Sequence, residues 1–282
     1  MNLNAAAYTP LIESIGAHAL PLFLGVLPAL MLSVAAFWGL AQRYAVPRDN
    51  TRLSPNAYLL MRLGLGFGVV VGGALLFAEL AEQLLEPGYA QRMGALDNLL
   101  SAAVGRSLPA SALQFFAAFT HLADTAWLSL LAAVVAALLI SRQHRWLALG
   151  WIVAVAGNAL LNTALKSIFA RTRPVHDNLL YTASGWSFPS GHSSGAVVVY
   201  GMLAYVLLRT WPRAQSSHAV SLLIVVMASA IAFTVGCSRV FIQVHYASDV
   251  LAGFASGSVW LAVCIGSMEA ARHRKGNLVG RI

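Results

Sequence analysis

Long apolar runs separated by short polar segments dominate the chain and predict a bundle of membrane-spanning helices. Crossing the hydrocarbon core of a bilayer takes about 20 predominantly apolar residues. We expect spans at about 18–40, 58–84, 124–140, 146–165, 189–208, 219–237 and 247–268. The predicted fold class is therefore all-α, a polytopic membrane helical bundle with six core spans and an extra N-terminal span.

Residues 85–120 have a different pattern, too polar to cross a membrane. An apolar stripe recurs there with helical spacing, formed by Leu96, Leu99, Leu100 and Ala103. Asp97 and Arg106 lie off this stripe, and Pro87 ends the preceding helix. This spacing predicts an amphipathic helix that lies in the membrane interface.

The composition supports a membrane protein and argues against a nucleic-acid partner. Of 282 residues, 59% are hydrophobic and only 10% are charged, whereas soluble domains carry about 25% charged residues. The net charge is +8. Most Lys and Arg residues lie in short loops between apolar runs, where they set the orientation of the spans. We therefore expect membrane lipids as partners and no nucleic acid; the oligomeric state is left open.

The distribution of basic residues predicts which side of the membrane each loop occupies. Loops 43–56, 141–145 and 209–218 are basic, as is the tail 269–282, whereas residues 1–17 contain no Lys or Arg. The positive-inside rule then places the C-terminus in the cytoplasm and the N-terminus outside. No basic segment precedes the first apolar run, so we expect no cleavable signal peptide. The predicted location is the bacterial inner (plasma) membrane.

Three polar clusters stand at the ends of spans on the predicted outer face. They are Lys166 to Pro174 with Arg171 and Arg173, then Pro189 to His192, then Ser238, Arg239, His245 and Asp249. Together they supply two imidazoles, one carboxylate and at least three fixed positive charges. Such a set suits a phosphate better than a metal cation.

The first cluster offers positive charge for phosphate oxygens. Lys166 and Arg173 are seven residues apart, so two turns of helix would put them on roughly one face, with Pro174 ending that helix. Arg173 can clamp oxygens through its planar fork, while Lys166 acts as a point charge. The alternative for Lys166 is snorkelling to the interface. Arg171 could be a second clamp; we favour a lipid headgroup contact.

The second cluster has the features of a helix start that binds anions. Ser190 suits an N-cap, and Gly191 allows close approach of the backbone. The free N–H groups and the positive dipole end of that helix attract an anion, towards which His192 in the first turn would point. The alternative is a plain capped turn.

In the third cluster, His245 and Asp249 are four residues apart and can face each other. The carboxylate would fix the imidazole tautomer and leave the other nitrogen free as a nucleophile. The alternatives are a structural His–Asp pair and a metal site that includes His192; the nearby cations disfavour the metal. The other histidines are taken as interface or packing residues: His18, His121, His144, His176, His218 and His273.

The three clusters, in this order and at these spacings, resemble the tripartite signature of the type 2 phosphatidic acid phosphatases. That superfamily includes lipid phosphate phosphatases, bacterial undecaprenyl-pyrophosphate phosphatases, acid phosphatases and vanadium haloperoxidases. The resemblance covers about residues 90–268. It divides a single membrane domain into N-terminal spans (1–84), a catalytic core (90–268) and a basic tail (269–282). Members commonly have six spans, so the first span here is additional.

The resemblance implies catalysis without a metal or another cofactor. His245 would attack phosphorus and form a phosphohistidine, with Asp249 orienting the ring. His192 would protonate the leaving oxygen and then activate water. The phosphoryl oxygens would be held by Lys166, Arg173, Arg239 and the backbone of Ser190 and Gly191.

The expected substrate is a lipid phosphate or pyrophosphate: undecaprenyl pyrophosphate, phosphatidate or phosphatidylglycerol phosphate. Its tail would stay in the bilayer, with Tyr181 and Trp186 lining an entrance. One alternative is a lipid phosphotransferase that passes the phosphoryl group to another lipid, such as lipid A. A second is a non-catalytic transporter or lipid-binding protein. A third, an intramembrane serine protease using Ser190, gives the surrounding cations no role.

Overall fold

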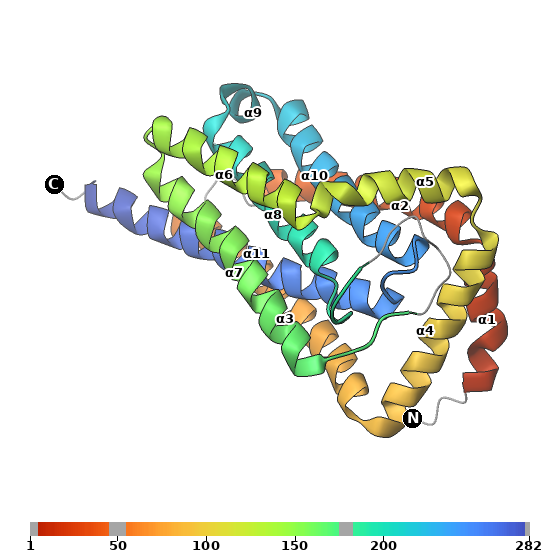
Figure 1. Ribbon diagram of the computed structural model, residues 1–282. Coiled ribbons are helices and arrows are strands. Elements are labelled where there is room, and N and C mark those ends of the chain that lie inside the picture. The colour runs from red at the N-terminus through yellow and green to blue at the C-terminus, as the bar shows by residue number, and fades with distance from the viewer. Residues whose placement is uncertain (1–4, 45–54, 175–182, 280–282) are drawn as a thin grey trace.

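The structure is a computed structural model that describes residues 5–44, 55–174 and 183–279, and these ranges contain helices and no strand. The order is α1 (Ala5–Ala17), α2 (Ala19–Tyr44), α3 (Pro55–Leu85), α4 (Pro87–Ser107), α5 (Ala110–Phe119), the 3₁₀ helix η1 (Thr120–Ala123), α6 (Thr125–Ser141), α7 (Arg145–Phe169), α8 (Gly191–Thr210), α9 (Pro212–Ser216), α10 (His218–Phe241) and α11 (Ala247–Val279). Figure 1 shows them as one helical bundle. The predicted all-α class is confirmed.

Six helical segments are long and apolar enough to cross a membrane. They are Ala19–Arg43, Leu63–Leu85, Arg145–Phe169, Gly191–Thr210, His218–Phe241 and Ala247–Arg274. The remaining expected span, 124–140, corresponds to α6, which has only 17 residues. It becomes a seventh span only together with Ala110–Ala123, across a bend of 42°. The chain is a multi-pass helical membrane protein, and its expected third span is the second half of a bent segment.

The bend has a local cause at Asp124. This residue joins η1 to α6 with φ −63° and ψ 146°, an extended conformation. An extended residue interrupts the i to i−4 hydrogen bonds of a helix, so the axis changes direction there. The carboxylate of Asp124 is thereby placed at a helix junction instead of on a helix face.

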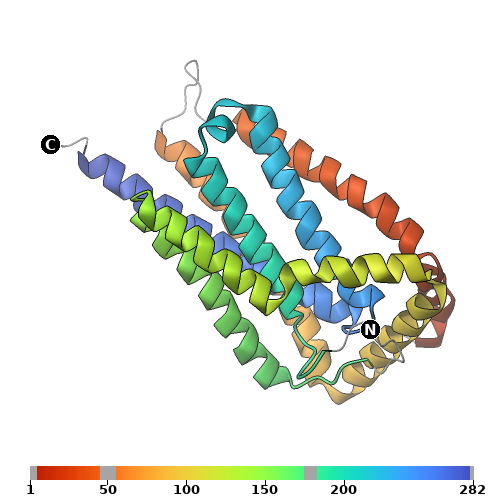
Figure 2. The ribbon, with the colours of Figure 1, turned by 45° about the horizontal axis from the view of Figure 1, so that its top comes forward.

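Helix α8 runs through the middle of the bundle and packs against α7, α10 and α11 (Figures 1 and 2). Its contact with α11 is close because two glycines face it. A Cβ on Gly253 would lie 2.6 Å from the carbonyl oxygen of Ser190, and one on Gly257 would lie 2.9 Å from Cα of Ser194. Small residues let membrane helices approach at backbone distance. The starts of α8 and α11 are therefore held side by side.

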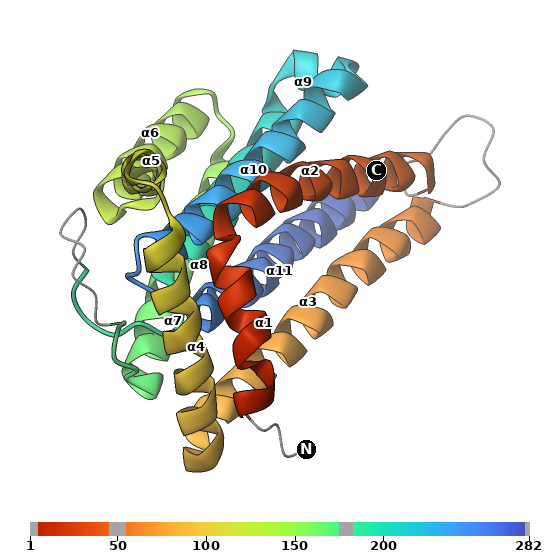
Figure 3. The same ribbon diagram turned by 90° about the vertical axis from the view of Figure 1, so that its right-hand side faces the viewer.

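The segment predicted to be amphipathic forms α4, and α1 runs beside it (Figure 3). No element is predicted for residues 1–17, yet α1 occupies most of them. Ser107 Oγ donates to the carbonyl of Gly16 at 2.8 Å, and a Cβ on Gly16 would lie 2.4 Å from Cβ of Ala103. Close backbone packing against α4, more than its own polarity pattern, therefore accounts for α1.

Candidate active site

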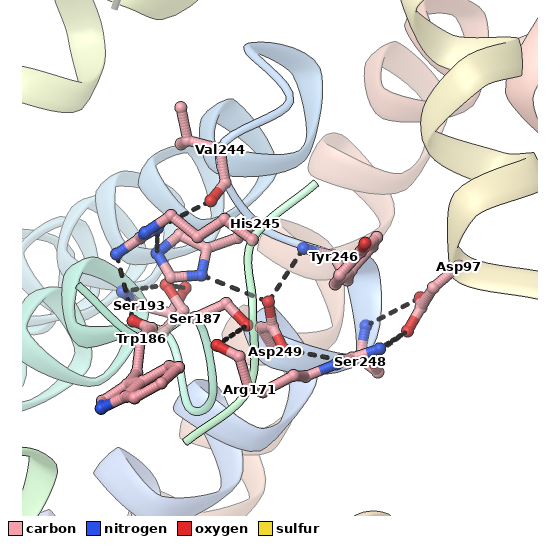
Figure 4. Close-up of polar contacts among 12 residues, drawn as sticks. Asp97, Arg171, Trp186, Ser187, Ser193, Val244, His245, Tyr246, Ser248 and Asp249 are labelled. Carbon is pink, nitrogen blue, oxygen red and sulfur yellow. Dashed lines mark hydrogen bonds and ion pairs between the residues drawn. The ribbon is translucent and has the colours of Figure 1, made fainter. Parts of the chain in front are cut away.

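The three polar clusters meet at one end of the bundle. Helices α7 and α10 end there, and α8 and α11 begin there. Figure 4 shows side chains from these segments pointing at one another around His245. The expectation that separate helix ends converge on one small site is therefore met by the geometry.

The first cluster differs from its predicted form, because α7 ends before Arg173. Ala170 caps the helix in the left-handed conformation, with φ 40°, and its N–H donates to the carbonyl of Lys166 at 3.0 Å. Residues 170–174 are not helical. The prediction that Lys166 and Arg173 share a helix face is wrong, because the helix stops at this cap and not at Pro174.

Arg173 nevertheless lies beside the histidine it was expected to serve. One terminal nitrogen donates to the carbonyl of Val244 at 2.7 Å and lies 3.0 Å from Nε2 of His245. Its other nitrogens donate, at 3.0–3.2 Å, to the backbone carbonyls of Ser184, Gly185 and Trp186. Held at several points, the guanidinium has a defined position next to the imidazole.

Lys166 also points into the cluster. Its ammonium donates to the carbonyl of Trp186 and lies 3.5 Å from that of Ser187. The Ser187 N–H in turn donates to the carbonyl of Arg171 at 2.8 Å. The backbone of the half-exposed Trp186 therefore contacts the basic cluster. Tyr181, the other expected entrance residue, lies outside the described residues.

The second cluster begins α8 as predicted. Ser190 is the N-cap, and its Oγ accepts from the N–H of Ser193 at 3.3 Å. Its own N–H donates to the carbonyl of Asp249 at 2.9 Å, which joins this turn to α11. A Cβ on Gly191 would lie 2.9 Å from Oδ1 of Asn162, so glycine lets the turn pack against α7. The positive end of α8 faces the site.

His192 has a partner that the sequence analysis missed. Its Nε2 lies 2.9 Å from Oδ1 of Asp124, whose Oδ2 lies 2.6 Å from Nδ1 of His121. His121 was expected to be an interface or packing residue. Nothing in the sequence pattern distinguishes Asp124, because its position depends on the bend between η1 and α6.

The third cluster holds His245 in the predicted pairing. Its Nδ1 lies 3.4 Å from Oδ2 of Asp249, and the same oxygen accepts the N–H of Tyr246 at 3.0 Å. His245 and Asp249 are 2% and 0% exposed, so both are shielded from water. Since Arg173 donates to Nε2 of His245, the proton sits on Nδ1 and Nε2 carries the lone pair.

The surroundings of His245 favour its neutral form. Burial has the largest effect, and the positive charges of Arg173 and Arg239 add to it. They lower the pKa of His245 well below the ordinary histidine value. Arg239 is 1% exposed and donates to Oγ1 of Thr120 at 2.8 Å. The imidazole is therefore a neutral base among fixed cations, which attract an anion.

Arg171 does not reach towards lipid headgroups, as was expected, but towards two carboxylates. It donates to Oδ1 of Asp249 at 2.7 Å and to Oδ2 of Asp97 at 2.9 Å. The same guanidinium lies 4.3 Å above the ring of Tyr246. Asp97 was placed off the apolar stripe of its helix, yet it is 8% exposed, because this ion pair turns it inwards.

The carboxylates near the histidines are engaged by these partners. Asp249 and Asp97 share the guanidinium of Arg171, and Asp124 lies between two histidines. Among the described residues, no group of three or more His, Cys, Asp or Glu side chains is arranged to hold a metal ion. The arrangement resembles an anion site with two imidazoles of different surroundings.

Comparisons with known proteins agree with this geometry. Residues 145–272 match the sequence profile of the PAP2 superfamily. Phosphatidylglycerophosphatase B of Bacillus subtilis (strain 168) is 36% identical over 138 residues, which is 49% of this chain and 66% of that protein. The alignment thus spans just under two thirds of the relative.

A solved structure is similar as well. It is the crystal structure of the first transmembrane PAP2 type phosphatidylglycerolphosphate phosphatase from Bacillus subtilis, with a TM-score of 0.65 and 29% sequence identity. The match covers 71% of this chain and 96% of that one. All three polar clusters fall inside residues 145–272. The resemblance expected from the clusters is confirmed for residues 145–272, which form a PAP2 superfamily domain.

Proposed function

We propose that the protein is a phosphatase that hydrolyses a lipid phosphate or pyrophosphate through a phosphohistidine, without a metal ion. The observation that carries the proposal is the position of His245: a buried imidazole whose Nε2 lies 3.0 Å from the guanidinium of Arg173. A phosphoryl group bound by the cations would lie against that nitrogen. The PAP2 domain at residues 145–272 supports the reaction class.

The first half of the reaction transfers the phosphoryl group to the protein. Nε2 of His245 attacks phosphorus while the bond to the leaving lipid oxygen breaks, and His192, as imidazolium paired with Asp124, gives that oxygen its proton. Asp249 accepts the Nδ1 proton of His245 in a hydrogen bond and stabilises the positive ring. The lipid leaves as an alcohol, or as a monophosphate when the substrate is a pyrophosphate.

The second half returns the protein to its starting state. Neutral His192 takes a proton from a water molecule, which attacks phosphorus and breaks the bond to His245. Inorganic phosphate leaves. In both steps the charge that builds on the phosphoryl oxygens would be stabilised by Lys166, Arg173, Arg239 and the backbone N–H groups at the start of α8.

The site suits a substrate whose tail remains in the bilayer. It lies at the ends of membrane-spanning helices, where the backbone of the half-exposed Trp186 contacts Lys166 and Arg173. The named relatives act on phosphatidylglycerophosphate, so this lipid is the first candidate, beside phosphatidate and undecaprenyl pyrophosphate. The basic loops 43–56, 141–145 and 209–218 support a site on the outer, periplasmic face of the inner membrane.

A panel of lipid phosphates tests the proposal. Purified protein in detergent is expected to release inorganic phosphate from at least one member of a panel of phosphatidylglycerophosphate, phosphatidate and undecaprenyl pyrophosphate. Labelled phosphate found in solution supports hydrolysis, whereas label found on a second lipid indicates a phosphotransferase. No release from any member at pH 5–8 would contradict the proposed activity.

Chelation is expected to leave the rate unchanged, because the proposed charge stabilisation comes from Lys166, Arg173 and Arg239 and not from a metal. The measurement compares phosphate release before and after incubation with EDTA and removal of the chelate. A loss of activity that a divalent cation restores would contradict the metal-free mechanism.

The pH dependence follows from the state of His245. Attack needs the neutral ring, and its lowered pKa keeps the ring neutral down to a pH below the ordinary histidine value of about 6.5. As pH falls through that lowered pKa, the ring is protonated and activity is lost. We therefore expect a bell-shaped profile of kcat/KM whose acid limb, after correction for the substrate's own ionisation near about pH 6, lies below about 6.5. An acid limb due to the enzyme that lies above that value would contradict the assignment to His245.

A further inference from the structure

We propose that helix α4 is a positioning helix for the turn that carries His245. The inference rests on the proposed function, in which His245 on this turn is the nucleophile. Helix α4 lies outside residues 145–272, the part that matches the PAP2 superfamily. It nevertheless contacts the turn on both sides of the histidine.

Three hydrogen bonds join α4 to the turn formed by residues 242–248. The amide of Gln243 donates to the carbonyl of Ser101 at 2.9 Å, and the hydroxyl of Tyr246 donates to Oδ1 of Asn98 at 2.9 Å. Two residues further on, Ser248 Oγ donates to Oδ2 of Asp97. Positions 97, 98 and 101 lie on one side of a helix. The contacts therefore bracket His245 from residue 243 to residue 248.

The turn has a conformation that needs such support. Gln243 has φ 58°, in the left-handed region that non-glycine residues avoid. Helix α4 approaches it closely, since a Cβ on Gly105 would lie 2.5 Å from Nε2 of Gln243. A strained residue persists when surrounding contacts determine its conformation, and here the contacts come from α4.

Asp97 also affects the position of Asp249, the carboxylate that faces Nδ1 of His245. Arg171 is shared: one terminal nitrogen binds Asp249 and the other binds Asp97. Asp249 faces His245 with Oδ2 and Arg171 with Oδ1. Without the charge of Asp97, Arg171 would bind Asp249 alone and draw it away from the imidazole. Asp97 thus keeps the guanidinium of Arg171 between two carboxylates. Figure 4 shows Asp97, Arg171 and Asp249 together.

The test begins with kinetics of Asp97→Asn, which removes the charge and leaves an acceptor for Ser248. We expect kcat to fall about tenfold, in the range of losses for outer partners of functional residues, with KM unchanged because Asp97 does not contact the substrate. The acid limb of kcat/KM should move to lower pH. The pKa of His245 is also lowered by the charged groups that face it: Lys166, Arg173, Arg239 and His192. Removing the negative charge of Asp97 leaves these positive charges less opposed, so the pKa of His245 falls further.

A second variant tests the other side of the turn. Asn98→Ala removes the partner of Tyr246 without altering charge, so kcat should fall while the acid limb stays in place. Gln91→Ala, at an exposed position of the same helix, is the matched control and should behave like the wild type. Two different pH responses from neighbouring positions would not arise from a general loss of folding.

Amide hydrogen exchange separates this inference from the proposed function. In Asp97→Asn and Asn98→Ala, residues 242–248 should exchange faster, while α8 and the cooperative unfolding temperature stay close to the wild type. This holds even if no lipid phosphate is hydrolysed. Unchanged exchange in the turn, or unchanged kcat in an active protein, would overturn the positioning role.

Discussion

Replacing His245 by alanine is expected to abolish phosphate release, with a loss of at least about 10⁴-fold in kcat, the scale seen when a catalytic nucleophile is removed. The imidazole is buried, and its Nε2 is the atom beside the guanidinium of Arg173. Rapid quenching with labelled substrate should trap an acid-labile phosphoenzyme in the wild type and none in the variant.

The control for this experiment is His218→Ala. His218 begins α10 at the other end of the bundle and is exposed, so its loss should leave both the rate and the phosphoenzyme intact. Full labelling of the His245→Ala protein would show that another residue carries the phosphoryl group. The phosphohistidine mechanism would then fail even if the protein is a phosphatase.

Replacing His192 by alanine is expected to lower the rate on a lipid phosphate by about 10²- to 10⁴-fold, the usual contribution of a general acid or base. The choice of leaving group reveals which step is affected. A lipid alkoxide needs the proton, whereas p-nitrophenolate leaves without one. With p-nitrophenyl phosphate, His192→Ala should give a burst of p-nitrophenol and accumulate phosphoenzyme, because only the attack of water is slowed.

Asp124→Asn provides the matched test of the bend between η1 and α6. It keeps a hydrogen-bonding group 2.9 Å from Nε2 of His192 but removes the charge that stabilises the imidazolium. The defect should therefore be of the same kind as in His192→Ala and smaller. The double variant should be no slower than His192→Ala alone, since residues that act as one unit are not additive. Additive losses in rate would show that Asp124 and His192 act independently.

Local patterns were sufficient for the parts of the site that depend on one segment. The cap at Ser190, the i, i+4 pair of His245 and Asp249, and the amphipathic helix around Leu96 all follow from spacing within a few residues. The span predictions also depend on a local property, the length of an apolar run. These elements are found where they were expected, except for the span at 124–140, which is the second half of a bent segment.

Other residues could not be assigned because their roles depend on distant segments. Asp97 looks like a surface residue of an interfacial helix until Arg171, 74 positions away, comes into contact with it. Asp124 looks like the plain start of a span until the bend sets it against His192. Arg173 was placed on a continuous helix because nothing at Ala170 signals a left-handed cap. Tertiary partners override local preference in each case.

The close approach of α8 to α11 limits how a pocket of this kind could be redesigned. Only 2.6 Å would separate a Cβ on Gly253 from the backbone oxygen of Ser190, whose amide is tied to Asp249. The turn at the start of α8, proposed to bind the phosphoryl group, and Asp249, proposed to orient His245, are thus joined directly to each other. Under the proposed function, a broader headgroup would have to be accommodated by changes in the segment around Trp186, since moving α8 and α11 apart would separate Ser190 from Asp249.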